Sequence, residues 1–220
     1  MNRIIIKELL ENRDVNENYL TSGWVKTKRE GKNIAFIMLN DGSCLQDLQV
    51  IVENEDGLIN SVDKITTGAS ISVLGKLIKS EGKGQTVELI AKEVVVLGES
   101  NPELYPIQPK RHTLDFLRKN AHLRFRTKTY SSIFRIRHGL SFAIHEFFHR
   151  RNFYYVHTPI ITSADAEGAG EMFKVTTLDM KTPPINQKGD IDYSKDFFEQ
   201  QANLTVSGQL EAELAALGLS

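Results

Sequence analysis

The hydrophobic pattern of this chain changes its period at a proline-rich segment, and this change divides the sequence into two parts. Three of the six prolines lie between Ser100 and Pro109, a density that excludes a helix or a central strand. Before this segment apolar and polar residues roughly alternate, as in a β-strand, and after it apolar residues recur at three- and four-residue steps, as in a helix. We therefore expect an α+β protein of two domains, residues 1–100 and 113–220, joined by a linker of residues 101–112.

The first part is predicted to form five short strands. Residues 19–26, 34–39, 48–52, 70–78 and 86–97 are rich in Val, Ile, Leu and Thr, and turns that contain Gly, Asn or Asp separate them. Residues 58–65 are predicted to form a short helix after the third strand. Five strands with one helix after the third is the order of the OB-fold barrel, a common binder of single-stranded nucleic acid.

The second part begins with helices. Thr113 is expected to cap a helix that ends at Ala121, and a long amphipathic helix is predicted over 130–151 from its apolar residues Ile133, Ile136, Leu140, Ala143, Ile144, Phe147 and Phe148. Strands are then predicted over 153–161 and 173–177. Residues 181–196 are expected to be an exposed polar excursion, and residues 209–217 a helix.

Charge is distributed unevenly along the chain, although the formal net charge is only -1. Between Tyr105 and Arg151, a stretch that we call the basic segment, eleven Lys and Arg residues stand against two acidic residues. A nucleic-acid phosphate backbone could follow this segment. Alternatively, these side chains form a solvated helix face and ion pairs within the chain.

Composition sets further bounds. Hydrophobic and charged residues make up 40% and 25% of the chain, as in a soluble globular protein, and no stretch approaches the length needed to cross a bilayer. The single cysteine, Cys44, excludes an internal disulfide and a cysteine-based metal cluster. We expect a cytoplasmic protein without a membrane partner or a resident metal site.

Two short segments carry candidate chemistry. Residues 164–173, rich in Ala and Gly with embedded carboxylates, are predicted to form a loop, so Glu167 is a candidate partner for a cationic group, or else a solvated loop acid. Residues 204–213 offer Ser207, Gln209 and Glu213 at the start of a helix, where they could hold a small polar molecule.

Three signatures, in this order, resemble the class II aminoacyl-tRNA synthetases, specifically the bacterial asparagine-tRNA ligases, over essentially the whole chain. Residues 23–25 with Phe36 and residues 40–43 resemble the anticodon-binding barrel, residues 153–161 resemble motif 1, and residues 204–213 resemble the amino-acid pocket. The resemblance implies ATP-dependent formation of an asparaginyl-adenylate and transfer to tRNA(Asn), with Mg²⁺, by a homodimer. It also implies that residues 113–220 form the incomplete first part of a catalytic domain, which consists of an antiparallel sheet with helices.

The resemblance also implies roles for particular residues. Phe36, Gln49 and Glu88 match the residues that meet the anticodon, although Phe36 could instead belong to the barrel core. Pro159 matches the signature position of motif 1, at a dimer interface or packed beneath the catalytic sheet.

For the amino acid, Glu167 matches an ammonium partner, and Ser207 and Gln209 match residues that orient the substrate. Aspartate enzymes carry a lysine where this chain has Ala212. Glu213, the next residue, would accept a hydrogen bond from a substrate carboxamide and repel a substrate carboxylate. Asparagine is therefore favoured. Alternatively, Glu213 is an exposed acid at the start of a helix.

Motifs 2 and 3 of the family, which hold the substrate carboxylate, the phosphates and the adenine, are not found in the sequence. We therefore assign no catalytic residue, and we expect the N-terminal portion of a longer enzyme, or a shortened form of it, that is inactive alone. The alternatives are an aspartate- or lysine-specific enzyme of the same class and a non-catalytic tRNA-binding OB module. Residues 113–220 are expected to be poorly soluble when expressed separately.

Overall fold

The computed structural model describes residues 2–11, 13–54, 57–82, 84–165, 168 and 172–219. The chain forms two compact units, residues 1–141 and 142–220, which we describe separately. The division falls inside helix α3 (Lys128–His149), so the linker, helix α2 (Leu114–Lys119) and the first part of α3 belong to the same unit as the barrel.

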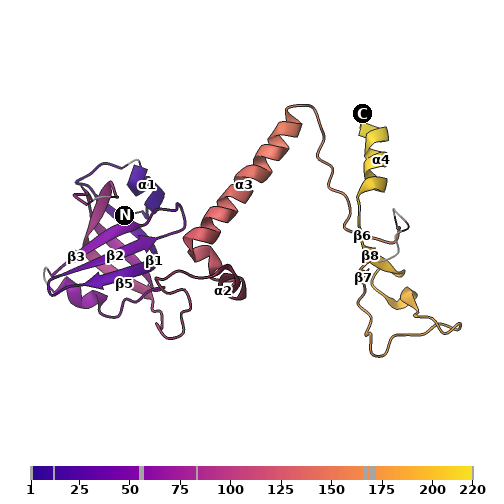
Figure 1. The fold of residues 1–220 in the computed structure, drawn as a ribbon, viewed down its shortest axis with the longest axis horizontal. Helices are drawn as coiled ribbons and strands as arrows, with labels where there is room; N and C mark the ends of the chain where they lie inside the picture. Colours follow the sequence, from indigo (N-terminus) through magenta and orange to yellow (C-terminus); the bar gives the residue numbers. More distant parts are fainter. Residues whose placement is uncertain are drawn as a thin grey trace. The chain divides into compact units, whose positions relative to one another are not determined.

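The first unit contains a closed five-stranded barrel (Figure 1). Strands β1 (Asn18–Glu30), β2 (Ile34–Asn40), β3 (Leu48–Glu53), β4 (Ser70–Lys79) and β5 (Val87–Gly98) close in the order β1-β2-β3-β5-β4. Every pair is antiparallel except β3 with β5, which is parallel. The predicted OB-fold barrel is confirmed, and the helix after the third strand is a short 3-10 helix, η1 (Leu58–Val62).

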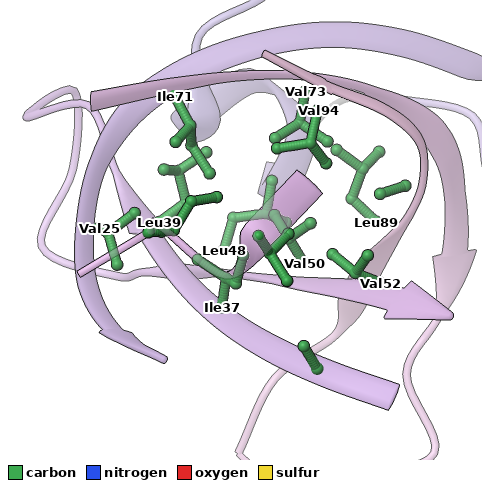
Figure 2. Packing of buried hydrophobic residues seen from close by; sticks show 14 of the residues in the cluster. Val25, Ile37, Leu39, Leu48, Val50, Val52, Ile71, Val73, Leu89 and Val94 are labelled. Atoms are coloured by element: carbon green, nitrogen blue, oxygen red, sulfur yellow. The ribbon is translucent and has the colours of Figure 1, made fainter. Parts of the chain in front are cut away.

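Alternating side chains of the strands fill the barrel (Figure 2). Ile37 and Leu39 of β2 and Leu48 and Val50 of β3 are completely buried, while the residues between them face outward. Burial of each such side chain contributes about 1.5–3 kcal/mol to folding. The sequence pattern predicts this core because the period of two places every second residue on the same side of the sheet.

A short helix that the sequence pattern does not predict, α1 (Ile6–Glu11), packs on the same core through Ile6 and Leu9. Its first turn is capped from elsewhere in the chain. The Ile6 backbone N–H donates to Asp41 Oδ2 at 3.0 Å, and the Lys7 N–H donates to Ser43 Oγ at 3.0 Å. Because these acceptors lie more than thirty positions away, local sequence carries no capping signal for α1.

The strand register of the barrel shifts at three places, one of them between Ser70 and Ile71 of β4. The β1–β2 register shifts between Val25 and Thr27, which leaves Lys26 as a bulge residue. The β4–β5 register shifts between Leu74 and Gly75, where a Cβ on Gly75 would lie 2.3 Å from the Ile90 carbonyl oxygen. Gly75 is therefore required by a close backbone approach.

The helices after the linker agree with their predicted positions. The Thr113 hydroxyl accepts from the Phe116 N–H at 3.2 Å, which confirms the predicted cap of α2. A 3-10 turn, η2 (Arg124–Arg126), then leads into α3. Ile107, Leu117 and Tyr130 form a second small core in this region.

The second unit holds a small antiparallel sheet in the order β6-β8-β7. Its strands are β6 (Ile161–Thr162), β7 (Lys174–Val175) and β8 (Ala202–Leu204), and the remaining elements are η3 (Tyr193–Lys195) and helix α4 (Gln209–Leu219).

The prediction of a strand over 153–161 is wrong, because only its last residue lies in β6. Phe153, Tyr154 and Tyr155 are 61%, 74% and 73% exposed, and residues 153–160 have no strand assignment in the described chain. An extended segment becomes a strand only when a neighbouring backbone pairs with it. Apolar composition alone therefore misidentified this segment.

The polar segment 181–196 is only partly an exposed excursion. Residues 185–190 are exposed, but Ile185 and Ile191 form an isolated antiparallel bridge around a turn, and Asp196 is buried. The lack of hydrophobic periodicity predicted the exposure but not these local hydrogen bonds.

Candidate functional site

Phe36, Gln49 and Glu88 lie on one outer face of the barrel. Met38 of β2 is paired with Gln49 of β3, and Gln49 is paired with Glu88 of β5, while Phe36 is two positions from Met38 on the same side of β2. Phe36 is half-buried and is absent from the barrel core cluster. The face defined by Phe36, Gln49 and Glu88, which we call the β2-β3-β5 face, therefore combines an aromatic ring with an amide and a carboxylate.

Hydrogen bonds fix the polar part of this face. The Gln49 Nε2 group donates to Glu88 Oε1 at 3.0 Å, and the Ser80 hydroxyl donates to the same oxygen at 2.8 Å. The Gln85 Nε2 group donates to it as well. Glu88 is only 7% exposed, so its carboxylate is held rather than mobile.

Many Lys and Arg side chains of the basic segment have interaction partners within the chain. Arg124 Cζ lies 4.8 Å from the Tyr130 ring centre, Arg126 Cζ lies 4.7 Å from that of Trp24, and Arg151 Cζ lies 3.6 Å from that of Phe147. Further partners within the chain are Asp115 for Arg118, Asp47 for Lys128, Glu146 for Arg150, and the Gly42 carbonyl for Arg135. Ion pairs and cation-π contacts therefore account for much of this segment.

A cavity of about 340 Å³ lies between β1, the 40–47 loop and the start of α3. It is lined by cationic and aromatic side chains, with one carboxylate, among them Trp24, Lys26, Asp47, His122, Arg126 and Lys128. Lys26 reaches into it from the bulge and donates to the Arg126 carbonyl oxygen. Burial lowers the pKa of the Lys26 ammonium group, Asp47 opposes this lowering, and Arg126 and Lys128 add to it.

The residues that are candidates for binding the amino-acid substrate follow β8 in the sequence. The Ser207 hydroxyl accepts from the Gln209 N–H at 3.1 Å, and Gln209 Nε2 donates to Glu213 Oε1 at 3.1 Å, one helical turn further on. Gln209 and Glu213 are exposed. The structure thus brings Ser207, Gln209 and Glu213 together at the start of α4.

Two other predicted site residues remain to be located, Glu167 and Pro159. Glu167 lies outside the described residues, so its relation to Ser207 and Glu213 stays a prediction. Pro159 is exposed and precedes β6 in an irregular stretch.

Asp196 is a buried carboxylate that sequence reasoning missed. Its Oδ1 accepts from the Thr177 N–H at 2.9 Å, the Thr177 hydroxyl at 2.8 Å and the Phe197 N–H at 2.8 Å. Hydrogen bonds from the Thr176 side chain and the Thr177 backbone hold the pKa of Asp196 far below its usual value. An acid directly before two phenylalanines was the only local signal, and it does not identify a hydrogen-bond hub.

No group of three or more His, Cys, Asp or Glu side chains is arranged to hold a metal ion within the described residues. In the same part of the chain, no helix combines the length and the apolar character needed to cross a membrane.

Comparison with known proteins finds a family match for each of the two parts of the chain. The family of OB-fold nucleic acid binding domains matches residues 19–97, and the family of class II tRNA synthetases (D, K and N) matches residues 113–211. The fold and these matches define a class II tRNA synthetase region joined to a nucleic-acid-binding barrel.

Individual proteins that are similar to this chain indicate which family within this class it matches. The asparagine-tRNA ligase of Cytophaga hutchinsonii is 50% identical over 221 residues, which is 100% of this chain and 48% of that protein. The asparagine-tRNA ligase of a Nostoc species is 51% identical over 217 residues, 98% of this chain and 47% of that protein. The chain therefore belongs to the asparagine-tRNA ligase family, and it spans about half the length of the curated relatives it matches.

A solved structure has the same fold. Asparaginyl-tRNA synthetase from Pyrococcus horikoshii, complexed with asparaginyl-adenylate, superposes with a TM-score of 0.79 at 20% sequence identity, over 100% of this chain and 46% of that one. At this identity the likeness establishes the fold alone.

Proposed function

We propose that this chain belongs to a cytoplasmic enzyme that attaches asparagine to tRNA(Asn) through an asparaginyl-adenylate made from ATP. In this proposal residues 1–100 bind the anticodon, residues 101–112 link the domains, and residues 113–220 supply part of the amino-acid pocket. The asparagine-tRNA ligase relatives support the proposal, and the observation that carries it is the β2-β3-β5 face.

The β2-β3-β5 face suits unpaired bases. A half-buried aromatic ring on an OB strand can stack on any base and contributes about 1–3 kcal/mol. The polar groups beside it are fixed acceptors: an ionised carboxylate only accepts, so the Gln49 amide nitrogen faces Glu88, which leaves Gln49 Oε1 to accept from a base. Such a face selects bases that present N–H groups on their pairing edge.

The Gln209–Glu213 pair supports asparagine as the amino acid. Glu213 carries a negative charge beside the amide of Gln209, so a carboxamide substrate could donate to it and a carboxylate substrate would be repelled. In the proposed pocket Ser207 and Gln209 orient the substrate, and Glu167 pairs with its ammonium group.

ATP with Mg²⁺ would supply the activating chemistry of the whole enzyme. Among the described residues no three or more His, Cys, Asp or Glu side chains are grouped to hold a metal ion, and we derive no step through Mg²⁺.

A homodimer is proposed from the exposed apolar surface of the second unit. Phe142, Phe148, Phe153 and Tyr155 line a groove of about 780 Å³ and are 64%, 45%, 61% and 73% exposed. Apolar patches of this kind mark interaction surfaces, and the motif 1 resemblance, with Pro159, supplies the second copy as the occupant. Sedimentation of the chain should show a dimer that Phe148→Asp converts to monomers, whereas a monomeric wild-type chain would contradict this part of the proposal.

The proposed RNA-binding role is tested with RNA hairpins that carry the asparagine anticodon. Phe36→Ala should weaken binding roughly 5- to 150-fold, as loss of one stacked base implies. Tyr19→Phe, also in the barrel, removes only a hydroxyl that donates to the Asp14 carbonyl and should bind normally. Unchanged affinity of Phe36→Ala would remove the stacking role and with it the main support for the proposal.

A further inference from the structure

Three donors converge on a single oxygen of the β2-β3-β5 face. Glu88 Oε1 accepts from Gln49, Ser80 and Gln85, whereas Oε2 accepts from none of the described residues. Nor is Oε2 among the buried unpaired atoms of the described chain. One oxygen of the carboxylate therefore accepts three hydrogen bonds, whereas no described residue donates to the other.

Two of these donors come from the turn between β4 and β5. Ser80 directly follows β4 and Gln85 lies two positions before β5, and the Ser80 N–H donates to the Thr86 carbonyl at 3.0 Å, which closes the turn. The Ser80 hydroxyl accepts from the Gly82 N–H at 3.0 Å, so its own hydrogen points to Glu88. The turn is built to present donors to this carboxylate.

We propose that Ser80 and Gln85 are positioning residues for base recognition by Gln49 and Glu88, an inference that rests on the proposed function. With both donors present, Oε1 is held toward the turn, Oε2 faces the ligand side, and the Gln49 amide keeps one orientation. Without them, the carboxylate rotates and Gln49 loses its fixed partner. The acceptor pattern offered to a base then becomes an average over orientations, and discrimination between bases falls.

Loss of Ser80 or Gln85 should affect the discrimination between bases and not the general affinity for RNA. Stacking on Phe36 and contacts to phosphates tolerate any base, so they survive the loss of Ser80 or Gln85. Ser80→Ala and Gln85→Ala should therefore lower the preference for the cognate hairpin while leaving the affinity for mismatched hairpins nearly unchanged.

The experiment measures dissociation constants of the full chain for the cognate hairpin and for hairpins with one anticodon base changed. The ratio of mismatched to cognate constants should fall by up to roughly 10- to 150-fold in Ser80→Ala and Gln85→Ala, as loss of a hydrogen bond to a charged group implies. Ser80→Thr keeps the hydroxyl and should restore the ratio. Glu81→Gln, an exposed residue in the same turn, is the matched control.

The outcomes separate this inference from the proposed function. If the wild-type chain discriminates and both alanine variants discriminate equally well, the positioning role is overturned and the proposed function stands. If the variants lose affinity for every hairpin to the same extent, the two residues only stabilise the barrel, which also overturns the inference. A wild-type chain that binds all hairpins equally overturns the proposed function and this inference together.

Discussion

The guanidinium carbon of Arg126 lies 4.7 Å from the centre of the Trp24 ring, so a cation at the end of η2 stacks on an aromatic side chain of β1. The same group lies 5.9 Å from the centre of the Tyr105 ring. This contact joins the barrel to the start of α3 within the first unit. A residue that the charge pattern offered for phosphate binding is thus engaged in holding the fold.

Arg126→Ala should lower the free energy of unfolding of the first unit by about 0.5–2 kcal/mol, the range for a cation over an aromatic ring. Urea denaturation of the full chain, followed by Trp24 fluorescence, measures this change. Arg111→Ala removes an exposed cation of the same segment and should leave stability unchanged. Equal effects of the two substitutions would show that the stacking contributes nothing.

Lys26→Met should change how barrel stability depends on pH. Because the pKa of Lys26 is lowered in the folded state, the unfolded chain binds more protons between that value and the ordinary value of 10.5. The contribution of Lys26 to stability therefore rises with pH across this window. Denaturation at a series of alkaline pH values should show a smaller rise in Lys26→Met than in the wild-type chain, and identical slopes would contradict the prediction.

Two glycines should respond oppositely to alanine. Gly75→Ala places a Cβ against the Ile90 carbonyl oxygen and should destabilise the barrel by about 1–3 kcal/mol or more, as overpacking does. Gly139 lies inside α3 with nothing within 4 Å of an added Cβ, so Gly139→Ala should stabilise the helix by up to about 1 kcal/mol. Thermal melts of both variants test the pair, and a stabilised Gly75→Ala would refute the close approach.

Asp196→Ala should release the turn after β7. The amides of Thr177 and Phe197 donate to Asp196, so their hydrogen exchange should accelerate in this variant, while Asp190→Ala, at an exposed position, should leave it unchanged. Since the folded pKa of Asp196 is depressed, its stabilising effect is complete above the ordinary value of 3.8 and is lost as the pH falls below it. Acidification below this value should therefore lower the protection of these two amides, relative to their intrinsic exchange rates, more in the wild-type chain than in Asp196→Ala.

The sequence predicts the elements whose signal is periodic and local. The five strands, the Thr113 cap and α3 follow from alternation, from a hydroxyl at a helix start and from helical spacing. Helix α1 is missed because its caps, Asp41 and Ser43, belong to a distant loop. The strand over 153–161 is wrong because strand formation depends on a pairing partner, which composition does not reveal.

The candidate site likewise contains residues that could be predicted from the sequence and residues that could not. Phe36, Gln49 and Glu88 could be named because the family resemblance assigns them, and strand alternation then accounts for their shared outer face. Ser80 and Gln85 could not be identified, since a polar turn gives no indication of which carboxylate its donors reach. Asp196 was hidden for the same reason.

The parallel pairing of β3 with β5 brings Gln49 beside Glu88, and it has a consequence for synthesis on the ribosome. A nascent chain that has exposed β1 to β4 still lacks the strand that completes the ring, so the β2-β3-β5 face cannot form before Gly98 has left the exit tunnel. The barrel surface that carries Phe36, Gln49 and Glu88 is therefore completed in one step, with the docking of the last strand.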